Sequence, residues 1–202
     1  MSVPVEHDKR KEEILDKALD VFVAEGYKDT TFQKIAERCG ITRTILYLYF
    51  NNKKEIFSSC IKRFMEGLET QIREVTGREG LPCADKLDLI GEMIVKECAK
   101  ESRLLSVVLD YLLRLRTAGG DPDERVRRRT IRLRHIFAVI IIEGKNKGEF
   151  AQETSVKATS ELFYAIIEAA VFRITVLGKK DASVLEEPMR LLTSAIRTSR
   201  QV

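Results

Sequence analysis

A short segment of this chain combines side chains that can form hydrogen bonds to the edges of DNA bases. Thr42, Arg43 and Thr44 are consecutive, and Tyr47 follows three residues later. The forked guanidinium of an arginine can pair with both acceptors of a guanine edge, and hydroxyl groups bond to bases or to phosphates. If these residues share the exposed face of a helix, the chemistry that they offer is recognition of duplex DNA.

Two short helices would have to position these side chains. The pattern predicts the first helix at 32–39, with either Thr30 or Thr31 as its N-cap. Ala36 is small enough to let a second helix cross closely, and Gly40 can adopt the positive φ that a tight turn requires. The segment therefore has the first half of a helix-turn-helix motif.

The second short helix is predicted from Thr42 to about residue 50. Leu46 and Tyr49 are three residues apart, so they share one face and are expected to point inward. Arg43 and Tyr47 then lie on the opposite, outer face together with Thr44. In a helix-turn-helix, this second helix enters the major groove and its early residues meet the base edges.

The local charge favours the DNA-binding interpretation over a plain helical hairpin within a bundle. Residues 28–54 contain six basic side chains and two acidic ones, whereas the whole chain of 202 residues has 35 basic and 31 acidic residues. Neutralising phosphates requires such a basic patch, although a charged segment can also be a solvated surface. The basic residues are Lys28, Lys34, Arg38, Arg43, Lys53 and Lys54.

The rest of the chain shows apolar residues at helical spacing and no convincing strand. Gly26 is predicted to stop the first helix, and Asp121 and Pro122 to start a later one. The last helix has two possible starts, Ser183 or Glu187, because Pro188 would interrupt its second turn. Besides the two short helices, we predict helices at 9–25, 53–75, 82–100, 103–116, 121–145, 154–177 and about 183–199.

Composition excludes several other classes of protein. The chain is 44% hydrophobic and 33% charged, which is typical of a soluble globular protein. Its longest strongly apolar run, 136–142, is too short to span a bilayer, and the charged N-terminus resembles no signal peptide. The four cysteines form no CxxC pair, so we expect a reduced, cytoplasmic protein with no membrane association.

An enzyme is the main alternative, and a module that binds another protein is a second one. With only His7 and His135, neither a histidine-rich metal site nor a Ser/His/Asp triad is expected. The chain contains no glycine-rich phosphate loop, zinc motif or nucleophile elbow. We therefore predict no catalytic residues, no metal and no cofactor.

Residues 9–57 resemble the N-terminal DNA-binding domain of TetR-type transcriptional regulators. The match rests on many fixed spacings over about a quarter of the chain. Its elements are Ile14, Leu15, Ala18, Phe22, Gly26, Tyr27, Thr31, Ile35, Ala36, Gly40, Ile41, Thr42, Leu46, Tyr47, Tyr49, Phe50, Lys53 and Phe57. The resemblance implies an all-α protein with a three-helix helix-turn-helix domain at 1–52 and a larger helical-bundle effector and dimerisation domain at 53–202.

The resemblance also implies roles for individual residues. In the family, the residue that matches Thr31 caps the second helix and approaches a phosphate. The residue that matches Gln33 can reach a base or the DNA backbone. Thr42, Arg43 and Thr44 match early positions of the recognition helix. Tyr47, Tyr49 and Lys53 match family positions that contact the phosphate backbone of DNA. Two residues depart from the usual pattern: Thr44 replaces a common glycine, and Leu48 stands where a polar or aromatic residue is usual.

The function implied is that of a repressor that binds a palindromic operator as a homodimer and is released by a small effector. The composition of the expected pocket favours a mostly apolar effector. The helix at 154–177 is apolar nearly all round, which suits a buried helix or a subunit interface. Expected dimer residues are Leu162, Ile166, Ala169, Ala170, Leu192 and Ile196. Expected pocket residues, each of which could equally be plain core, are Phe64, Met65, Leu68, Met93, Leu105, Leu109, Leu112, Phe137, Phe163 and Tyr164.

An arginine-rich run at 125–134 is denser in charge than the helix-turn-helix segment. Helical spacing directs most of its arginines outward, so a solvated face is the favoured interpretation. The alternative is a site for an anionic ligand or a partner, for which Arg129 or Arg132 would have to turn inward.

Overall fold

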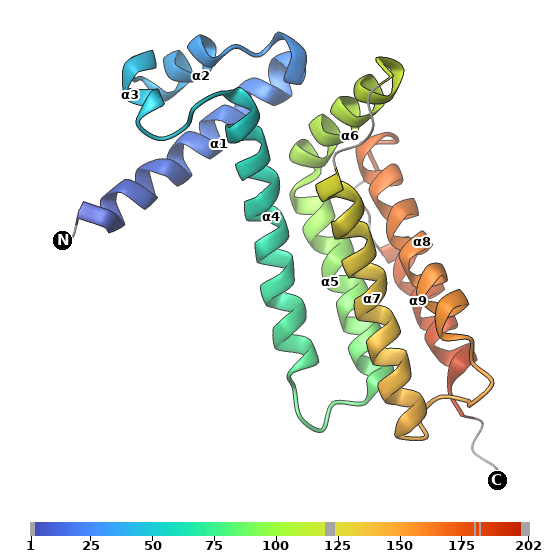
Figure 1. Ribbon diagram of the computed structural model, residues 1–202. Helices are drawn as coiled ribbons and strands as arrows, with labels where there is room; N and C mark the ends of the chain where they lie inside the picture. The colour runs from blue at the N-terminus through green and yellow to red at the C-terminus, as the bar shows by residue number, and fades with distance from the viewer. Residues whose placement is uncertain (1–2, 120–123, 180, 182, 199–202) are drawn as a thin grey trace. The chain divides into compact units, whose positions relative to one another are not determined.

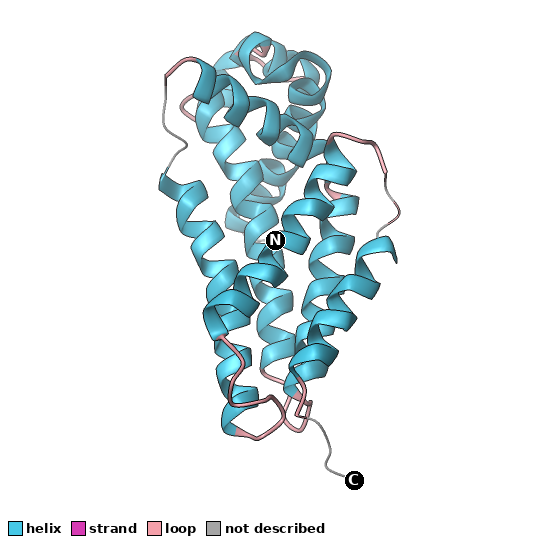
Figure 2. Ribbon diagram, turned by 90° about the vertical axis from the view of Figure 1, so that its right-hand side faces the viewer, coloured by secondary structure: helices cyan, strands magenta, loops and turns pink. Residues whose placement is uncertain are grey.

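The computed structural model describes residues 3–119, 124–179, 181 and 183–198, and the regular elements in these ranges are all α-helices (Figures 1 and 2). A single isolated antiparallel bridge joins Phe150 to Arg197. The predicted all-α fold is confirmed. The helices are α1 (Val3–Asp29), α2 (Phe32–Cys39), α3 (Arg43–Tyr47), α4 (Lys53–Thr76), α5 (Cys83–Lys100), α6 (Ser102–Thr117), α7 (Glu124–Asn146), α8 (Val156–Thr175) and α9 (Ser183–Ile196).

The first helix is interrupted where the sequence predicted its end. Gly26 has φ 75° and ψ 164°, a conformation outside the helical region, and a further short helical stretch then runs to Asp29. Thr30 closes this corner, since its hydroxyl donates to the carbonyl of Gly26 at 2.7 Å. The kink turns the chain toward α2, which packs against α1.

The chain divides into two compact units whose limits differ from the domain boundary predicted at residues 52 and 53, and that boundary stays a prediction. Unit 1 comprises residues 1–67 and 103–120, and unit 2 comprises 68–102 and 121–202. The difference arises because side chains of α4 and α6 are buried in the same core as the helix-turn-helix. Phe57 of α4 is 2% exposed there, and Leu104 of α6 is also 2% exposed.

The core of unit 1 is built from α1, α2, α3, the first part of α4 and the first part of α6. Phe22, Ile35 and Leu46 have no measurable exposure, so each of the first three helices buries at least one large apolar side chain. Tyr27 and Phe57 add an aromatic contact, with ring centroids 4.9 Å apart. Burial of this kind is the main favourable term that holds short helices in place.

Unit 2 is a bundle in which α5 packs against α7, α8 and α9, and α8 packs against both α7 and α9. Phe137 of α7 and Phe163 of α8 are fully buried and stack with centroids 5.2 Å apart. Among the described side chains of the bundle, one buried side chain is charged: the ammonium of Lys86, 5% exposed, is 3.4 Å from a carboxylate oxygen of Glu143. Pairing of this kind is what permits a charge to be buried.

The last helix begins at Ser183, so the alternative start at Glu187 is wrong. Pro188 lies inside α9 and removes one backbone donor. Both Pro188 and Val184, one turn earlier, are exposed, so water can reach the carbonyl that loses its partner. The predicted start of α7 at Asp121 and Pro122 lies outside the described residues, as do the side chains of Ser183 and of residues 125–129.

All four cysteines are buried thiols, two in each unit. Cys39 and Cys60 belong to unit 1, and Cys83 and Cys98 to unit 2; none is more than 4% exposed. Desolvation raises the pKa of Cys60 and of Cys98 to about 12 and that of Cys83 to about 11. They are therefore held in the thiol form at neutral pH.

Among the described residues, no helix has the length and apolarity needed to cross a membrane. The same part of the chain contains no cluster of three or more His, Cys, Asp or Glu side chains that could hold a metal ion.

Candidate nucleic-acid interface

The turn between α2 and α3 has the geometry that its residues predict. Thr31, not Thr30, is the N-cap of α2, because its hydroxyl accepts from the backbone N–H of Lys34 at 3.2 Å. Gly40 follows α2 in the left-handed region, with φ 68°. Ala36 is fully buried where the two helices meet, as expected for a small residue at a close crossing.

The short helix α3 is also capped by a threonine. The hydroxyl of Thr42 accepts from the backbone N–H of Ile45 at 3.2 Å. The helix ends at Tyr47 rather than near residue 50, because the next backbone N–H groups bond three residues back: that of Leu48 to Ile45 and that of Tyr49 to Leu46, both at 3.1 Å. Leu46 is fully buried and anchors the helix in the core.

The outer face of α3 presents the side chains that the sequence predicted for base contacts. Thr42, Arg43 and Thr44 are exposed, and Tyr47 is 48% exposed. Arg43 and Tyr47 are one helical turn apart and are linked, since Nη2 of Arg43 donates to the Tyr47 hydroxyl at 2.9 Å. The guanidinium also lies 5.5 Å from the centre of the Tyr47 ring. This contact limits the directions in which Arg43 extends from the helix.

Thr31 and Gln33 lie on the exposed side of α2, at its N-terminal end. Nε2 of Gln33 donates to Glu37 at 2.8 Å, so the amide is partly engaged within its own helix. Tyr49 is half-buried after α3, and the ring of His7 stacks on it at 4.7 Å. The side chains predicted to approach phosphates therefore come from the N-cap of α2, the end of α3, the segment after α3 and the start of α4.

Lys53 occupies a different environment from the one that the resemblance implies. Its ammonium donates to three backbone carbonyls, those of Tyr27 at 2.9 Å, Lys28 at 2.8 Å and Thr30 at 2.6 Å. An ammonium has three N–H donors, so these carbonyls use all of them. Burial lowers the pKa of Lys53, while the charge of Asp29 opposes that change. Lys53 therefore fastens the start of α4 to the corner that carries Thr31.

Replacing Lys53 by methionine is expected to lower the free energy of unfolding by about 2 kcal/mol, since hydrogen bonds to a charged group are worth about 1.5–3 kcal/mol and the carbonyls would lose their donor. The salt dependence of DNA binding should stay unchanged, because this ammonium is used within the chain. Urea unfolding and binding at several salt concentrations measure the two effects. Lys62→Met, at an exposed position of α4 where we place no DNA contact, is the control. A salt slope lower by about one in Lys53→Met alone would instead assign the ammonium to a phosphate.

Ion pairs tie several basic residues of the patch to α1. Lys34 lies 2.7 Å from Glu25, and Arg38 lies 2.9 Å from Asp20. Asp20 also accepts from Arg103 at 2.9 Å, so one carboxylate connects α1 with α2 and with α6 inside unit 1. Hydrogen bonds from Arg38 and then from Arg103 lower the pKa of Asp20.

Because the pKa of Asp20 is lower in the folded state than in the unfolded chain, its stabilising effect is present above about pH 4 and disappears as the pH falls through the folded value. Asp20→Asn is therefore expected to destabilise the protein by about 0.5–1 kcal/mol at pH 7, the range for partly exposed ion pairs. The difference from wild type should shrink as the pH falls below about 4, in unfolding curves measured over a series of pH values. A difference that does not depend on pH would rule out the ionic origin.

Two exposed side chains of this surface were not predicted to take part in it. Leu48 is 73% exposed directly after α3, and Ile45 within α3 is 41% exposed. An apolar side chain is usually expected to point inward. The one indication that Ile45 and Leu48 point outward was that Leu46 and Tyr49 already occupy the inner face of the helix.

The predicted pocket residues are divided between the two units. Unit 1 contains Phe64, Met65, Leu105, Leu109 and Leu112, all of them half-buried, and unit 2 contains Leu68, Met93, Phe137, Phe163 and Tyr164. Within unit 2, Leu68, Phe137 and Phe163 are buried. Their role in binding an effector stays a prediction.

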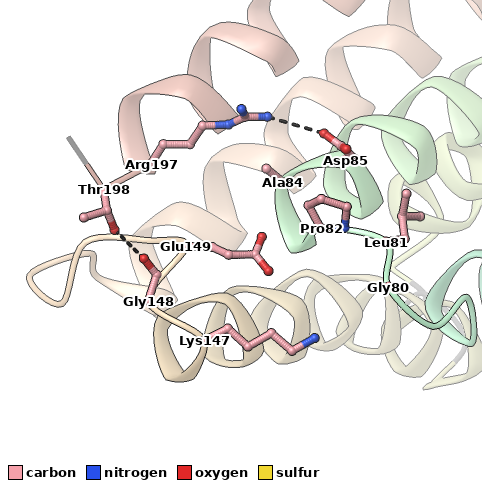
Figure 3. A pocket seen from close by; sticks show the side chains of 10 residues that line it. All are labelled: Gly80, Leu81, Pro82, Ala84, Asp85, Lys147, Gly148, Glu149, Arg197 and Thr198. Atoms are coloured by element: carbon pink, nitrogen blue, oxygen red, sulfur yellow. Dashed lines mark hydrogen bonds and ion pairs between the residues drawn. The ribbon is translucent and has the colours of Figure 1, made fainter. Parts of the chain in front are cut away.

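The described hollows of unit 2 are lined by other residues. One hollow has a volume of about 610 Å³. It is formed by the segment before α5 with the first turn of α5, and by the segments after α7 and α9, whose side chains are drawn in Figure 3. Its polar groups are largely engaged with one another: Glu149 accepts from the backbone N–H of Cys83 at 2.6 Å, and Arg197 lies 3.4 Å from Asp85. A second hollow, of about 330 Å³, lies between residues 69–76 of α4 and residues 135–143 of α7.

The predicted dimer residues lie on α8 and α9 but differ in exposure. Leu162 is 53% exposed and Ala169 is exposed, whereas Ile166 and Leu192 are half-buried. Ala170 and Ile196 are buried within the chain itself.

The arginine run at 125–134 is described only in its last part. Arg132 is exposed and lies 3.2 Å from Glu69, and Arg134 lies 2.9 Å from Glu161. These two side chains form surface ion pairs within unit 2, which agrees with the solvated interpretation. The side chains of residues 125–129, including Arg129, lie outside the described residues.

Comparison with known proteins agrees with this geometry. Residues 14–60 match the family model of bacterial regulatory proteins, tetR family. The chain is 38% identical to the uncharacterized HTH-type transcriptional regulator YfiR of Bacillus subtilis over 96% of this chain and 95% of that protein. It is 27% identical to the fatty acid metabolism regulator protein of the same species, over 79% and 80% of the two chains.

A solved structure shows that the fold is shared. The fatty acid degradation regulator FadR from Bacillus halodurans superposes with a TM-score of 0.72 at 24% identity, and the match covers 91% of this chain and 94% of that one. A capped helix-turn-helix with exposed hydrogen-bonding side chains, followed by a helical bundle, defines a helix-turn-helix transcriptional regulator. This chain belongs to the TetR family of such regulators.

Proposed function

We propose that this regulator is a homodimeric repressor that binds a palindromic DNA operator and is released by a small, mostly apolar molecule. The observation that carries the proposal is the exposed outer face of α3, on which Arg43 and Tyr47 are linked and stand beside two threonines. These groups suit the edges of bases in a major groove. The contact residues that we propose are Thr31, Gln33, Thr42, Arg43, Thr44, Tyr47 and Tyr49, with Lys53 holding their support.

Charge supports the same assignment. Lys28 and Lys54 are exposed at the two ends of the helix-turn-helix segment. Cations at these positions favour a polyanion, and they contribute affinity for any DNA sequence. Arg43 is the side chain best suited to read a particular base pair, because its donors can engage both acceptors of guanine.

A dimer through α8 and α9 is supported by apolar side chains that this chain leaves exposed. Leu162 and Phe172 of α8 are each 53% exposed, and Leu191 of α9 is 63% exposed. Helices α8 and α9 pack against each other, so these exposed side chains come from neighbouring helices of unit 2. A two-fold axis there would present two copies of α3 to a palindromic operator. We assign the partner contact to Leu162, Ile166, Ala169 and Leu192, and leave Ala170 and Ile196 to the core of each subunit.

Leu162→Arg tests the dimer, with Ile131→Arg as its control. Ile131 on α7 has nearly the same exposure, 55% against 53%, so both variants place an arginine at an equally exposed apolar position. We expect Leu162→Arg to sediment as a monomer and to lose cooperative operator binding, while Ile131→Arg stays dimeric. If both variants remain dimers, this helix pair is not the interface.

The effector is proposed to be mostly apolar because the residues expected to line its pocket are leucines, methionines and aromatics, with few polar groups. One relative is named a fatty acid metabolism regulator protein, and one structural neighbour a fatty acid degradation regulator, which fits an apolar metabolite. The relatives are named as regulators, which favours this function over an enzyme.

The complete proposal is tested with the full-length protein and a random pool of duplex DNA. We expect selection to recover a palindrome, a shift assay to show a dimer on it, and fatty acids of suitable chain length to release it. Recovery of no preferred duplex would overturn the proposal, whereas recovery without release by any fatty acid would overturn only the effector class.

A further inference from the structure

The most exposed large apolar side chain in the described part of the chain lies on the proposed DNA-binding surface. Leu48 is 73% exposed, and Ile45, three residues earlier, is 41% exposed. Each large apolar side chain left in water forgoes the favourable free energy of burial. Leu48 directly follows the helix that holds Arg43 and Tyr47, and its own backbone is still helical, with φ −69° and ψ −20°.

Helical spacing separates the outer surface of α3 into two rows. Arg43 and Tyr47 form a polar row, one turn apart and joined by their hydrogen bond. Thr44 and Leu48 are likewise one turn apart, and Ile45 is three residues before Leu48, so their methyl groups form an apolar row next to the first. A surface that reads DNA with this helix presents guanidinium, hydroxyl and methyl groups together.

The occupant of the apolar row follows from the chemistry of the groove. The C5-methyl group of thymine is the only apolar group that the four base pairs present on their major-groove edges. An apolar protein partner would also have to cover Arg43 and the hydroxyl groups of the polar row, which would leave them without partners. Duplex DNA satisfies both rows at once, because its phosphates and guanine edges complement the basic and polar side chains while thymine methyls cover the apolar ones.

We propose that Leu48, supported by Ile45, is a specificity-determining residue that reads thymine methyl groups, so that each half-site contains thymine within a few base pairs of the guanine engaged by Arg43. This inference rests on the proposed DNA-binding function and adds the class of base to it. Thymine can lie on either strand, since both strands expose the methyl group in the same groove.

The test removes single methyl groups from the DNA. In the operator recovered by selection, each thymine of a half-site is replaced in turn by deoxyuridine, and the full-length protein is titrated against each duplex. At one to three positions, wild type should bind about fourfold more weakly, the effect of one buried methyl group. Substitution of both half-sites at once should weaken binding about fifteenfold, because separate sites contribute additively.

Protein variants show which side chain covers the methyl group. Leu48→Ala, and Leu48→Gln as a second variant, should bind duplexes with thymine or deoxyuridine at the sensitive positions with equal affinity. Leu113→Ala is the matched control, because Leu113 is a leucine of α6 in the same unit and is 57% exposed. Leu113→Ala should retain the full sensitivity, and thermal melting verifies that all variants fold.

The outcomes separate this inference from the function on which it rests. If wild type tolerates deoxyuridine at every position of a recovered operator, or if both Leu48 variants keep the fourfold loss at the same thymines, the thymine-reading role is wrong and DNA binding stands. If no operator is recovered at all, the proposed function itself fails.

Discussion

Arg43→Ala should weaken operator binding by about 1–3 kcal/mol for each half-site and should abolish the preference for guanine at one position. The physical reason is that a guanidinium donates two parallel hydrogen bonds to O6 and N7 of guanine, which no other base pair reproduces. The structure adds a second reason: Tyr47 already holds Nη2 of Arg43 at 2.9 Å, so less side-chain freedom remains to be lost on binding. Binding to operators with single base-pair changes measures the effect.

The control for this experiment is Arg116→Ala. Arg116 is exposed on α6 in the same unit, so the variant loses the same charge at a position where we place no base contact. It should bind all sequences with nearly wild-type preferences. Replacing the guanine by 7-deazaguanine, which lacks the N7 acceptor, should weaken wild type and leave Arg43→Ala unaffected. An identical sequence profile for wild type and Arg43→Ala would exclude the base-reading role.

Gly144→Ala is expected to lower the free energy of unfolding by about 2 kcal/mol. A Cβ atom at Gly144 of α7 would lie 2.2 Å from Cδ2 of Phe150, a ring that is buried at 1% exposure. Overpacking of this kind costs about 1–3 kcal/mol and here exceeds the gain of about 1 kcal/mol from helix propensity. Urea unfolding measures the loss, and the melting temperature should fall by about 4–8 °C.

Two further variants show whether the clash is the cause. Gly67→Ala in α4 is the control, because a Cβ there meets nothing within 4 Å, and this variant should stabilise the protein by up to about 1 kcal/mol. In a Phe150→Ala background the ring is gone and only Cβ of Cys83, at 3.1 Å, remains close, so adding Gly144→Ala should cost much less than it does in wild type. Equal losses from Gly144→Ala with and without the Phe150 ring would refute the steric explanation.

Local signals predicted the elements of this fold well. The bounds of α2 agree with the prediction at 32–39, because a capping threonine and a left-handed glycine are decided by neighbouring residues. The end of α3 was placed about three residues too late. Its last turn is decided by how Leu46 and Phe50 are buried in the core, and side-chain spacing alone does not encode that packing.

The candidate site was predictable where it depends on exposure along one helix. Arg43, Thr44 and Tyr47 follow from helical geometry once Leu46 is placed inward. The position of Lys53 was not predictable, because the carbonyls that it binds lie 23 to 26 residues earlier and meet it only after the chain folds. Packing between helices also decides which apolar residues line a pocket or a subunit contact. Periodicity therefore indicated candidates, but it did not separate Ala170, in the core, from Ala169, on the surface.

The buried cysteines provide a native reporter for each half of the molecule. An alkylating reagent can modify Cys60 only when unit 1 opens, and Cys98 only when unit 2 opens, since both thiols are shielded and protonated. Peptide mass spectrometry would separate the two labelling rates without any introduced probe. Operator DNA should slow alkylation of Cys60, and a small molecule that binds the bundle should slow alkylation of Cys98, so the same experiment could screen for both ligands.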